Sequence, residues 1–190
     1  MAGADIEARP RWRRLRIAVW MGAALMLLLP AMAMQLTDAM NWGPGDFAVL
    51  GAMLLGAAGA LELAARFSGS GAYLAAGGIA VGTAFLVIVV NLAVGIVGSE
   101  ANPANLLFAG VLGVGIVGAF AARFRPRGMA LALVAMAGAQ ILFAIIALLA
   151  GLGTIHGTIP VVTILLVTLW LASALLFRKA AQEGDRTGAA

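Results

Sequence analysis

Long apolar stretches alternate with short polar segments along the whole chain. Six of them are long enough to cross the roughly 30 Å hydrocarbon core of a bilayer at about 1.5 Å per helical residue. They cover residues 17–34, 47–65, 72–97, 106–122, 129–149 and 159–177. None shows the alternation typical of barrel strands, and backbone groups in lipid must be paired internally. The pattern therefore predicts an all-α protein, a polytopic transmembrane helical bundle of about six spans.

Composition supports lipid as the solvent of this chain. Of 190 residues, 63% are apolar and 11% are charged, and the mean hydropathy is +1.06. A soluble domain usually carries about a quarter charged residues. The net charge of +4 does not indicate a nucleic-acid partner, because the basic residues lie in the tails and in the short connections between apolar stretches and form no basic face. The absence of cysteine excludes disulfides, iron–sulfur clusters and thiolate metal sites.

The basic residues predict the orientation of the spans. Every lysine and arginine falls in a tail or in an alternate connection, so that all lie on one side of the membrane, which the positive-inside rule makes cytoplasmic. We expect a basic cytoplasmic tail (1–16), a transmembrane domain (17–177) and a second cytoplasmic tail (178–190), an N-in, C-in arrangement. The residues concerned are Arg9, Arg11, Arg13, Arg14, Arg16, Arg66, Arg123, Arg125, Arg127, Arg178, Lys179 and Arg186.

The first apolar stretch has an alternative interpretation as a cleaved signal peptide. Its basic start, apolar centre and Ala31-Met32-Ala33 resemble a secretory signal with a cleavage site, which would leave five spans. We favour a retained span because the apolar run has full membrane length.

Residues at the predicted helix ends agree with this division. Asp46, Asn105 and Thr158 are expected to cap the N-termini of spans two, four and six, and Pro160 suits the first turn of span six. Glycines are expected where helices stop, at positions that include Gly71, Gly128 and Gly151. A match between residues 64–71 and 121–128 suggests, as a hypothesis, a repeated helical hairpin.

Few polar residues lie within the spans. Glu62 precedes Arg66 by one helical turn, which predicts an ion pair at the membrane interface, with a proton or cation site as the alternative. Thr83, Gln140 and Thr168 each lie about 15 Å from a span end and form a candidate midplane polar layer. The threonines are expected to bond to their own backbone, and Gln140 to another helix.

The outer connections gather a candidate polar cluster. Carboxylates with one histidine can ligate a divalent cation, but no close ligand spacing supports a metal here. Nor do the residues supply a nucleophile with its base, paired haem ligands or an intramembrane lysine, so we expect no enzyme and no cofactor. The cluster consists of Asp38, Asn41, Asn91, Glu100, Asn102, Asn105 and His156.

Small residues recur at four-residue spacing, which lets helix backbones approach closely in lipid. These stripes predict close helix packing of one of three kinds: within the chain, between copies of the chain in a homo-oligomer, or with a membrane-protein partner. They are Gly78 with Gly82, Ala109 with Gly113, Gly115 with Ala119, and Gly118 with Ala122.

Three segments carry a resemblance to a family. Residues 34–42 (MQLTDAMNW) with Asp46 and Phe47, residues 91–106 (NLAVGIVGSEANPANL) and residues 122–129 (ARFRPRGM) resemble a group of small multi-spanning bacterial inner-membrane proteins with no known activity. The resemblance implies a bacterial inner-membrane location and no particular chemistry. Asn91, Glu100, Asn102 and Asn105 lie within the second segment.

Two function classes follow. The first is a small structural or accessory protein that packs against a partner in the bilayer. The second is a small-solute transporter or channel component with a polar path from the outer face to Gln140. We favour the first, because no unpaired charged residue occupies the centre of a span, where coupled transport usually places one.

Overall fold

A computed structural model describes residues 4–36, 42–67, 70–93, 96–97, 102–152 and 157–188, and the side chains of most of them. In this part of the chain every regular element is helical. The α-helices are α1 (Ala4–Leu36), α2 (Pro44–Phe67), α3 (Gly71–Ala93), α4 (Leu106–Ala121), α5 (Pro126–Leu149) and α6 (Thr158–Gly188), and a 3₁₀ turn, η1 (Pro103–Asn105), precedes α4. The predicted all-α class is confirmed.

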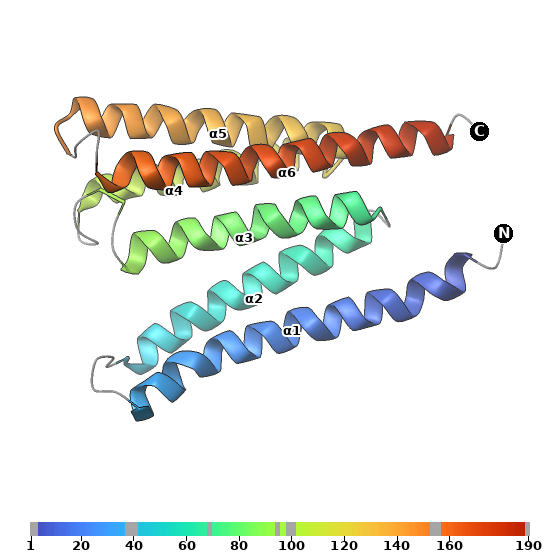
Figure 1. The fold of residues 1–190 in the computed structure, drawn as a ribbon, viewed down its shortest axis with the longest axis horizontal. Helices are drawn as coiled ribbons and strands as arrows, with labels where there is room; N and C mark the ends of the chain where they lie inside the picture. Colours follow the sequence, from blue (N-terminus) through green and yellow to red (C-terminus); the bar gives the residue numbers. More distant parts are fainter. Residues whose placement is uncertain are drawn as a thin grey trace. The chain divides into compact units, whose positions relative to one another are not determined.

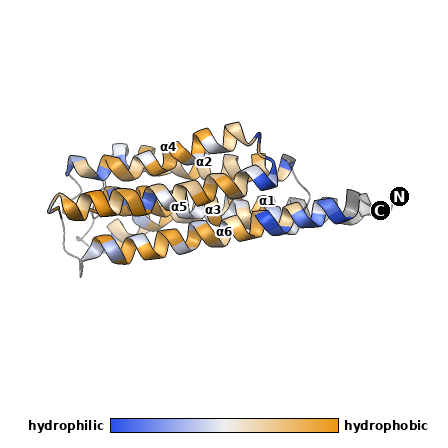
Figure 2. Ribbon diagram, turned by 90° about the horizontal axis from the view of Figure 1, so that it is seen from above, coloured by the Kyte–Doolittle hydropathy of each residue, from blue (hydrophilic) through white to orange (hydrophobic). Residues whose placement is uncertain are grey.

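Six of the described helices are long and apolar enough to cross a membrane. Hydrophobic residues follow each helix over most of its length, and hydrophilic residues gather on the C-terminal part of α6 (Figure 2). The chain is therefore a multi-pass membrane protein, as the apolar pattern predicted.

The chain divides into two compact units, Met1–Glu62 and Leu63–Ala190. The first unit comprises α1 and most of α2 (Figure 1). α1 continues without a break through Ala31-Met32-Ala33. At the start of α2, the Asp46 carboxylate accepts a hydrogen bond of 2.8 Å from the Gly43 backbone N–H.

Asp46 therefore has a different role from the one predicted. Since α2 begins at Pro44, Asp46 is the third helical residue and not the N-cap. Its side chain reaches back to the cap position, which is half of a capping box.

The second unit is a bundle of α3, α4, α5 and α6. α6 packs against both α3 and α5, and α4 packs against the other side of α5, whereas α3 and α4 touch only sparsely (Figure 1). The core consists mainly of alanine and medium-sized aliphatic side chains, and its aromatic members are Tyr73, Phe108, Trp170 and Phe177. The α3–α4 seam is the loosely packed side of this bundle.

Two of the predicted small-residue stripes lie in the α4–α5 contact. A Cβ added at Gly118 would stand 2.7 Å from the Cβ of Ala132, and one added at Gly115 would stand 2.5 Å from the Met136 sulfur. Glycine is therefore what allows these two helices to approach so closely. At Gly113 an added Cβ meets no atom within 4 Å, so the stripe of Ala109 and Gly113 is not used in this contact.

The ends of α4 and α5 show one confirmed and one incorrect glycine prediction. After α5, Gly151 has φ +71°, and the backbone bonds Leu152 N to Ala147 O and Gly151 N to Leu148 O complete a Schellman motif, as glycine there predicted. After α4, the same motif is built on Arg123, with φ +49°, followed by Phe124, with φ +56°.

Gly128 and Gly71 do not stop helices. Gly128 is the third residue of α5, and Gly71 begins α3. An added Cβ at Gly128 would stand 2.5 Å from the Cβ of Ala122, so close packing explains this glycine. The hairpin-repeat hypothesis is not supported locally, because Phe67 is helical whereas its counterpart Phe124 has a positive φ.

Candidate functional site

The connection between α3 and α4 is organised by Asn105. Its Oδ1 accepts hydrogen bonds from the backbone N–H groups of Ile96, at 2.9 Å, and Val97, at 2.8 Å. Asn105 is 8% exposed, and Ile96 and Val97 are at most 1% exposed. Since buried backbone donors must be paired, this one side chain replaces the partners that a continuing helix would have supplied.

Two predictions fail at this point, both because of Asn105. The third span was expected to reach Val97, but α3 ends at Ala93, four residues earlier. Asn105 was expected to cap α4, but its backbone is already helical and its side chain makes no capping bond. The cap belongs to Asn102, whose Oδ1 accepts from the Ala104 N–H at 3.0 Å.

Asn91 lies two residues before the end of α3. Its Nδ2 donates to the Val87 carbonyl at 2.8 Å, which fixes the side chain against its own helix. Its Oδ1 is buried and has no hydrogen-bond partner among the described residues. An unpaired buried acceptor costs about 1–3 kcal/mol. Asn91 thus has an acceptor atom that none of the described residues uses.

These three asparagines line one pocket of about 450 Å³ in the α3–α4 seam. The other described residues that line it are apolar: Val87, Ile88, Leu92, Pro103, Leu106, Ala109 and Leu112. Asn91, Asn102 and Asn105, three members of the predicted outer polar cluster, are therefore brought together. The other four, Asp38, Asn41, Glu100 and His156, lie outside the described residues.

The candidate midplane layer is only partly interior. Thr83 is 2% exposed and donates to the Ile79 carbonyl at 2.7 Å, as expected of a threonine in a helix. Thr168 makes the same bond to Ile164 but lies on an exposed side of α6, so it does not share the interior with Thr83.

Gln140 is 0% exposed, and neither of its amide atoms has a hydrogen-bond partner in the described structure. It points into the bundle as predicted, but the expected bond to another helix is not formed. The pocket in the α3–α4 seam does not include it.

In the first unit, Glu62 faces a partner that the sequence did not suggest. Its Oε1 lies 3.6 Å from Nε of Arg16 on α1. The predicted partner, Arg66, stands one turn further along α2, and a pair between the two stays a prediction. A contact between residues far apart in sequence leaves no signal in local spacing, which is why Arg16 was missed.

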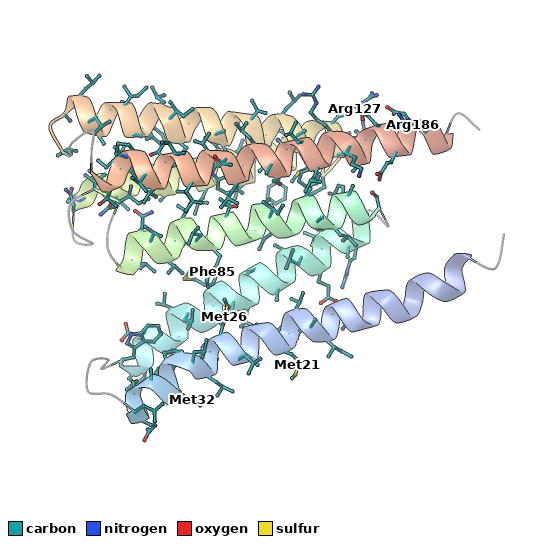
Figure 3. The ribbon with its side chains drawn as sticks, in the orientation of Figure 1. Met21, Met26, Met32, Phe85, Arg127 and Arg186 are labelled. Carbon is teal, nitrogen blue, oxygen red and sulfur yellow. The ribbon has the colours of Figure 1, made fainter. Side chains whose placement is uncertain are left out.

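Several polar contacts in the second unit were also missed. The Tyr73 hydroxyl donates to the Phe124 carbonyl at 2.7 Å, and the Ser173 hydroxyl donates to the Ala76 carbonyl at 2.7 Å. Arg127 pairs with Asp185 at 2.6 Å, and Arg127 and Arg186 lie at the same end of the unit (Figure 3). These contacts tie α3 to the α4–α5 turn and to α6, and α5 to α6.

Within the described ranges, no three His, Cys, Asp or Glu side chains are arranged to hold a metal ion. Among the described residues that line the α3–α4 pocket, the polar groups are neutral carboxamides, and they lie beside aliphatic side chains. No family model, curated protein or solved structure matches the chain.

Proposed function

We propose that this multi-pass membrane protein is a small accessory protein of the bacterial inner membrane that binds a partner membrane protein through α4. In this proposal both termini are cytoplasmic, and the chain has no catalytic or transport cycle. The proposal places the chain in the resembling inner-membrane group.

One observation carries the proposal: a small-residue stripe on α4 is left open. We define the α4 outer face as Gly113, Ile116, Val117 and Phe120. The three large members are 59%, 70% and 68% exposed, and Gly113 has room for a side chain. Ala109, four residues before Gly113, is also exposed. The small residues Ala109 and Gly113 allow the backbone of a partner helix to approach closely, and the neighbouring large apolar side chains provide a surface on which that helix can pack.

The interior supports this proposal over transport. Gln140, the residue to which a polar path would lead, is 0% exposed, so water does not reach it in this conformation. The pocket near Asn91 has a mainly aliphatic lining and does not extend to α5.

Site-directed photo-crosslinking tests the partner. A photoreactive amino acid at Val117 should capture a defined protein in native membranes, and the same residue at Leu131 on α5, which is 72% exposed, should not. Gly113→Leu should abolish the Val117 product. The matched control is Gly138→Leu, because Gly138 is also open but has the large residues Val134 and Leu142 one turn away on either side. Equal capture at Val117 and Leu131, or capture that Gly113→Leu leaves intact, would contradict the proposal.

A second candidate function rests on the unpaired amide of Gln140. A solute that both donates and accepts hydrogen bonds would pair with both amide atoms of Gln140. A transporter component requires such a solute-binding residue within the membrane. Gln140→Leu distinguishes the two. If Gln140 has no ligand, removing its unpaired amide should stabilise the bundle or leave it unchanged in a reversible unfolding assay in bicelles. Clear destabilisation by Gln140→Leu would instead show that the amide has a partner in the membrane.

A further inference from the structure

The exposed side of α6 changes from apolar to basic along the helix. In its membrane-spanning part this side carries Ile164, Leu171 and Leu175, which are 67%, 41% and 63% exposed. Helical spacing continues the same side beyond Leu175, where hydrophilic residues replace hydrophobic ones (Figure 2). We define the α6 outer stripe as these three residues together with Arg178, Lys179, Gln182 and Arg186, which are all exposed.

The length of α6 places this change at the membrane surface. The helix has 31 residues and is about 46 Å long, whereas the hydrocarbon core of a bilayer is about 30 Å thick. About twenty residues cover that thickness, so a span that starts at Thr158 leaves the hydrocarbon near Phe177. Arg178 and Lys179 therefore stand at the level of the lipid headgroups, and Arg186 stands about 12 Å further along the helix than Arg178.

The acidic residues in this part of α6 do not neutralise its cations. Residues 178–186 contain three cations and two carboxylates, so the sequence alone suggests a segment of low net charge. The Glu183 carboxylate accepts a hydrogen bond of 3.0 Å from the Ser70 hydroxyl, just before α3. Asp185 pairs with Arg127 of α5. Neighbouring elements thus hold both carboxylates, whereas no described residue forms an ion pair with the three cations, Arg178, Lys179 and Arg186.

We propose that the α6 outer stripe binds an anionic phospholipid. The lipid phosphate lies against Arg178 and Lys179, and the acyl chains follow the apolar part of the stripe. A zwitterionic lipid fits the apolar part equally well, but its own cation leaves the charge of the helix uncompensated. Each basic residue near the membrane surface favours an anionic lipid by about fivefold. An acidic soluble protein would match the charge but would make no use of the apolar residues.

The inference is independent of partner binding through the α4 outer face, because α4 and α6 present separate surfaces. It concerns the lipid next to one side of α6, so its test needs a local readout. The full chain, with a photoreactive amino acid at Leu175, is placed in nanodiscs that contain equal amounts of phosphatidylglycerol and phosphatidylcholine with identical acyl chains. After illumination, mass spectrometry of the protein gives the ratio of the two captured lipids.

The ratio at Leu175 should favour phosphatidylglycerol by at least about fivefold, the effect of one surface cation. The positional control is Ile164, which lies on the same stripe about 16 Å from Leu175 along the helix, towards the other membrane surface. The photoreactive residue at Ile164 should capture the two lipids in nearly equal amounts. Equal preference at both positions would show that the captured lipid does not depend on the basic end of α6, and would contradict the proposal.

Substitution of the two cations at the headgroup level provides the second arm. Arg178→Gln combined with Lys179→Gln should lower the ratio at Leu175 to nearly one. Arg186→Gln should lower it only slightly, since Arg186 stands more than a Debye length further from the headgroups. These side chains are exposed, so the substitutions leave the core intact.

The matched control for charge is Arg123→Gln combined with Arg125→Gln. It removes the same charge from exposed side chains of the α4–α5 turn and should leave the ratio at Leu175 nearly unchanged. An equal loss in this control would show that net charge, and not the α6 outer stripe, selects the lipid. A preference that survives in the variant without Arg178 and Lys179 would also overturn the proposal.

The remaining arms distinguish the lipid from other anions. Sodium chloride and sodium phosphate at equal ionic strength should lower the ratio at Leu175 equally, because both act by screening. A larger effect of phosphate would show a site for inorganic phosphate and overturn the lipid assignment. A ratio near one in the unmodified chain, in nanodiscs that hold no other protein, would leave an acidic soluble protein as the occupant and would equally overturn it.

Discussion

Replacing Asn105 by alanine should release the segment between α3 and α4. The substitution removes the acceptor that pairs the N–H groups of Ile96 and Val97. Each buried donor left unpaired costs about 1–3 kcal/mol, so the two together should destabilise the closed segment by about 2–6 kcal/mol. Because about 1.4 kcal/mol is a tenfold change in an equilibrium constant, opening should become at least about thirtyfold more frequent.

The chain contains no cysteine, so a single reporter can measure this opening. Val97 is 0% exposed, and Val97→Cys should react slowly with a water-soluble maleimide in nanodiscs. Adding Asn105→Ala should raise the labelling rate by at least about thirtyfold, as estimated above from the two lost bonds. The matched control is Asn102→Ala, which loses one bond to Ala104 and should leave the Val97 rate nearly unchanged. A rate within threefold of the parent in Asn105→Ala would refute the assigned role of Asn105.

Further predictions concern helix contacts and turns, and each is measured as a change in unfolding free energy in bicelles. Gly118→Ala should destabilise the protein by about 1–3 kcal/mol, because the new methyl group meets a Cβ and a backbone carbon of α5. Gly115→Ala should cost less, because its methyl group meets the flexible end of a methionine side chain. Equal costs for the two variants would contradict the contact geometry. Arg123→Gly should stabilise by about 1 kcal/mol, since Arg123 has a positive φ that glycine adopts without strain, and a loss of stability would refute a left-handed turn there. Tyr73→Phe should cost about 1 kcal/mol through loss of its 2.7 Å bond, and a neutral result would show that this bond is not formed.

The sequence was sufficient to predict the helical spans because the membrane constrains them so strongly. Apolar length alone located all six helices, since lipid permits few other structures. Helix ends were harder to predict. Ile96 and Val97 extend an apolar run, yet they lie outside α3 because a side chain that follows later in the sequence captures their N–H groups. The end of α4 was predicted to within one residue, but its stop was assigned to Gly128, whereas the Schellman motif forms on Arg123.

Three members of the candidate site were predicted from the sequence, but their geometry was not. Asn91, Asn102 and Asn105 were grouped as outer polar residues, and the structure does place them around one pocket. That two of them are occupied by backbone bonds, while Oδ1 of Asn91 is left unpaired, depends on tertiary packing. Contacts such as Arg16 with Glu62 likewise join distant residues and leave no trace in local spacing.

The most direct test of the account asks on which side of the membrane each end of the second unit lies. Leu152, which follows α5, and Gln182, near the end of α6, are both exposed. In bacterial spheroplasts, Leu152→Cys should react with a membrane-impermeant maleimide, and Gln182→Cys should react only after the membrane is opened. The opposite pattern, or equal labelling of both positions in intact spheroplasts, would contradict a chain that crosses the membrane with its arginines and lysine inside.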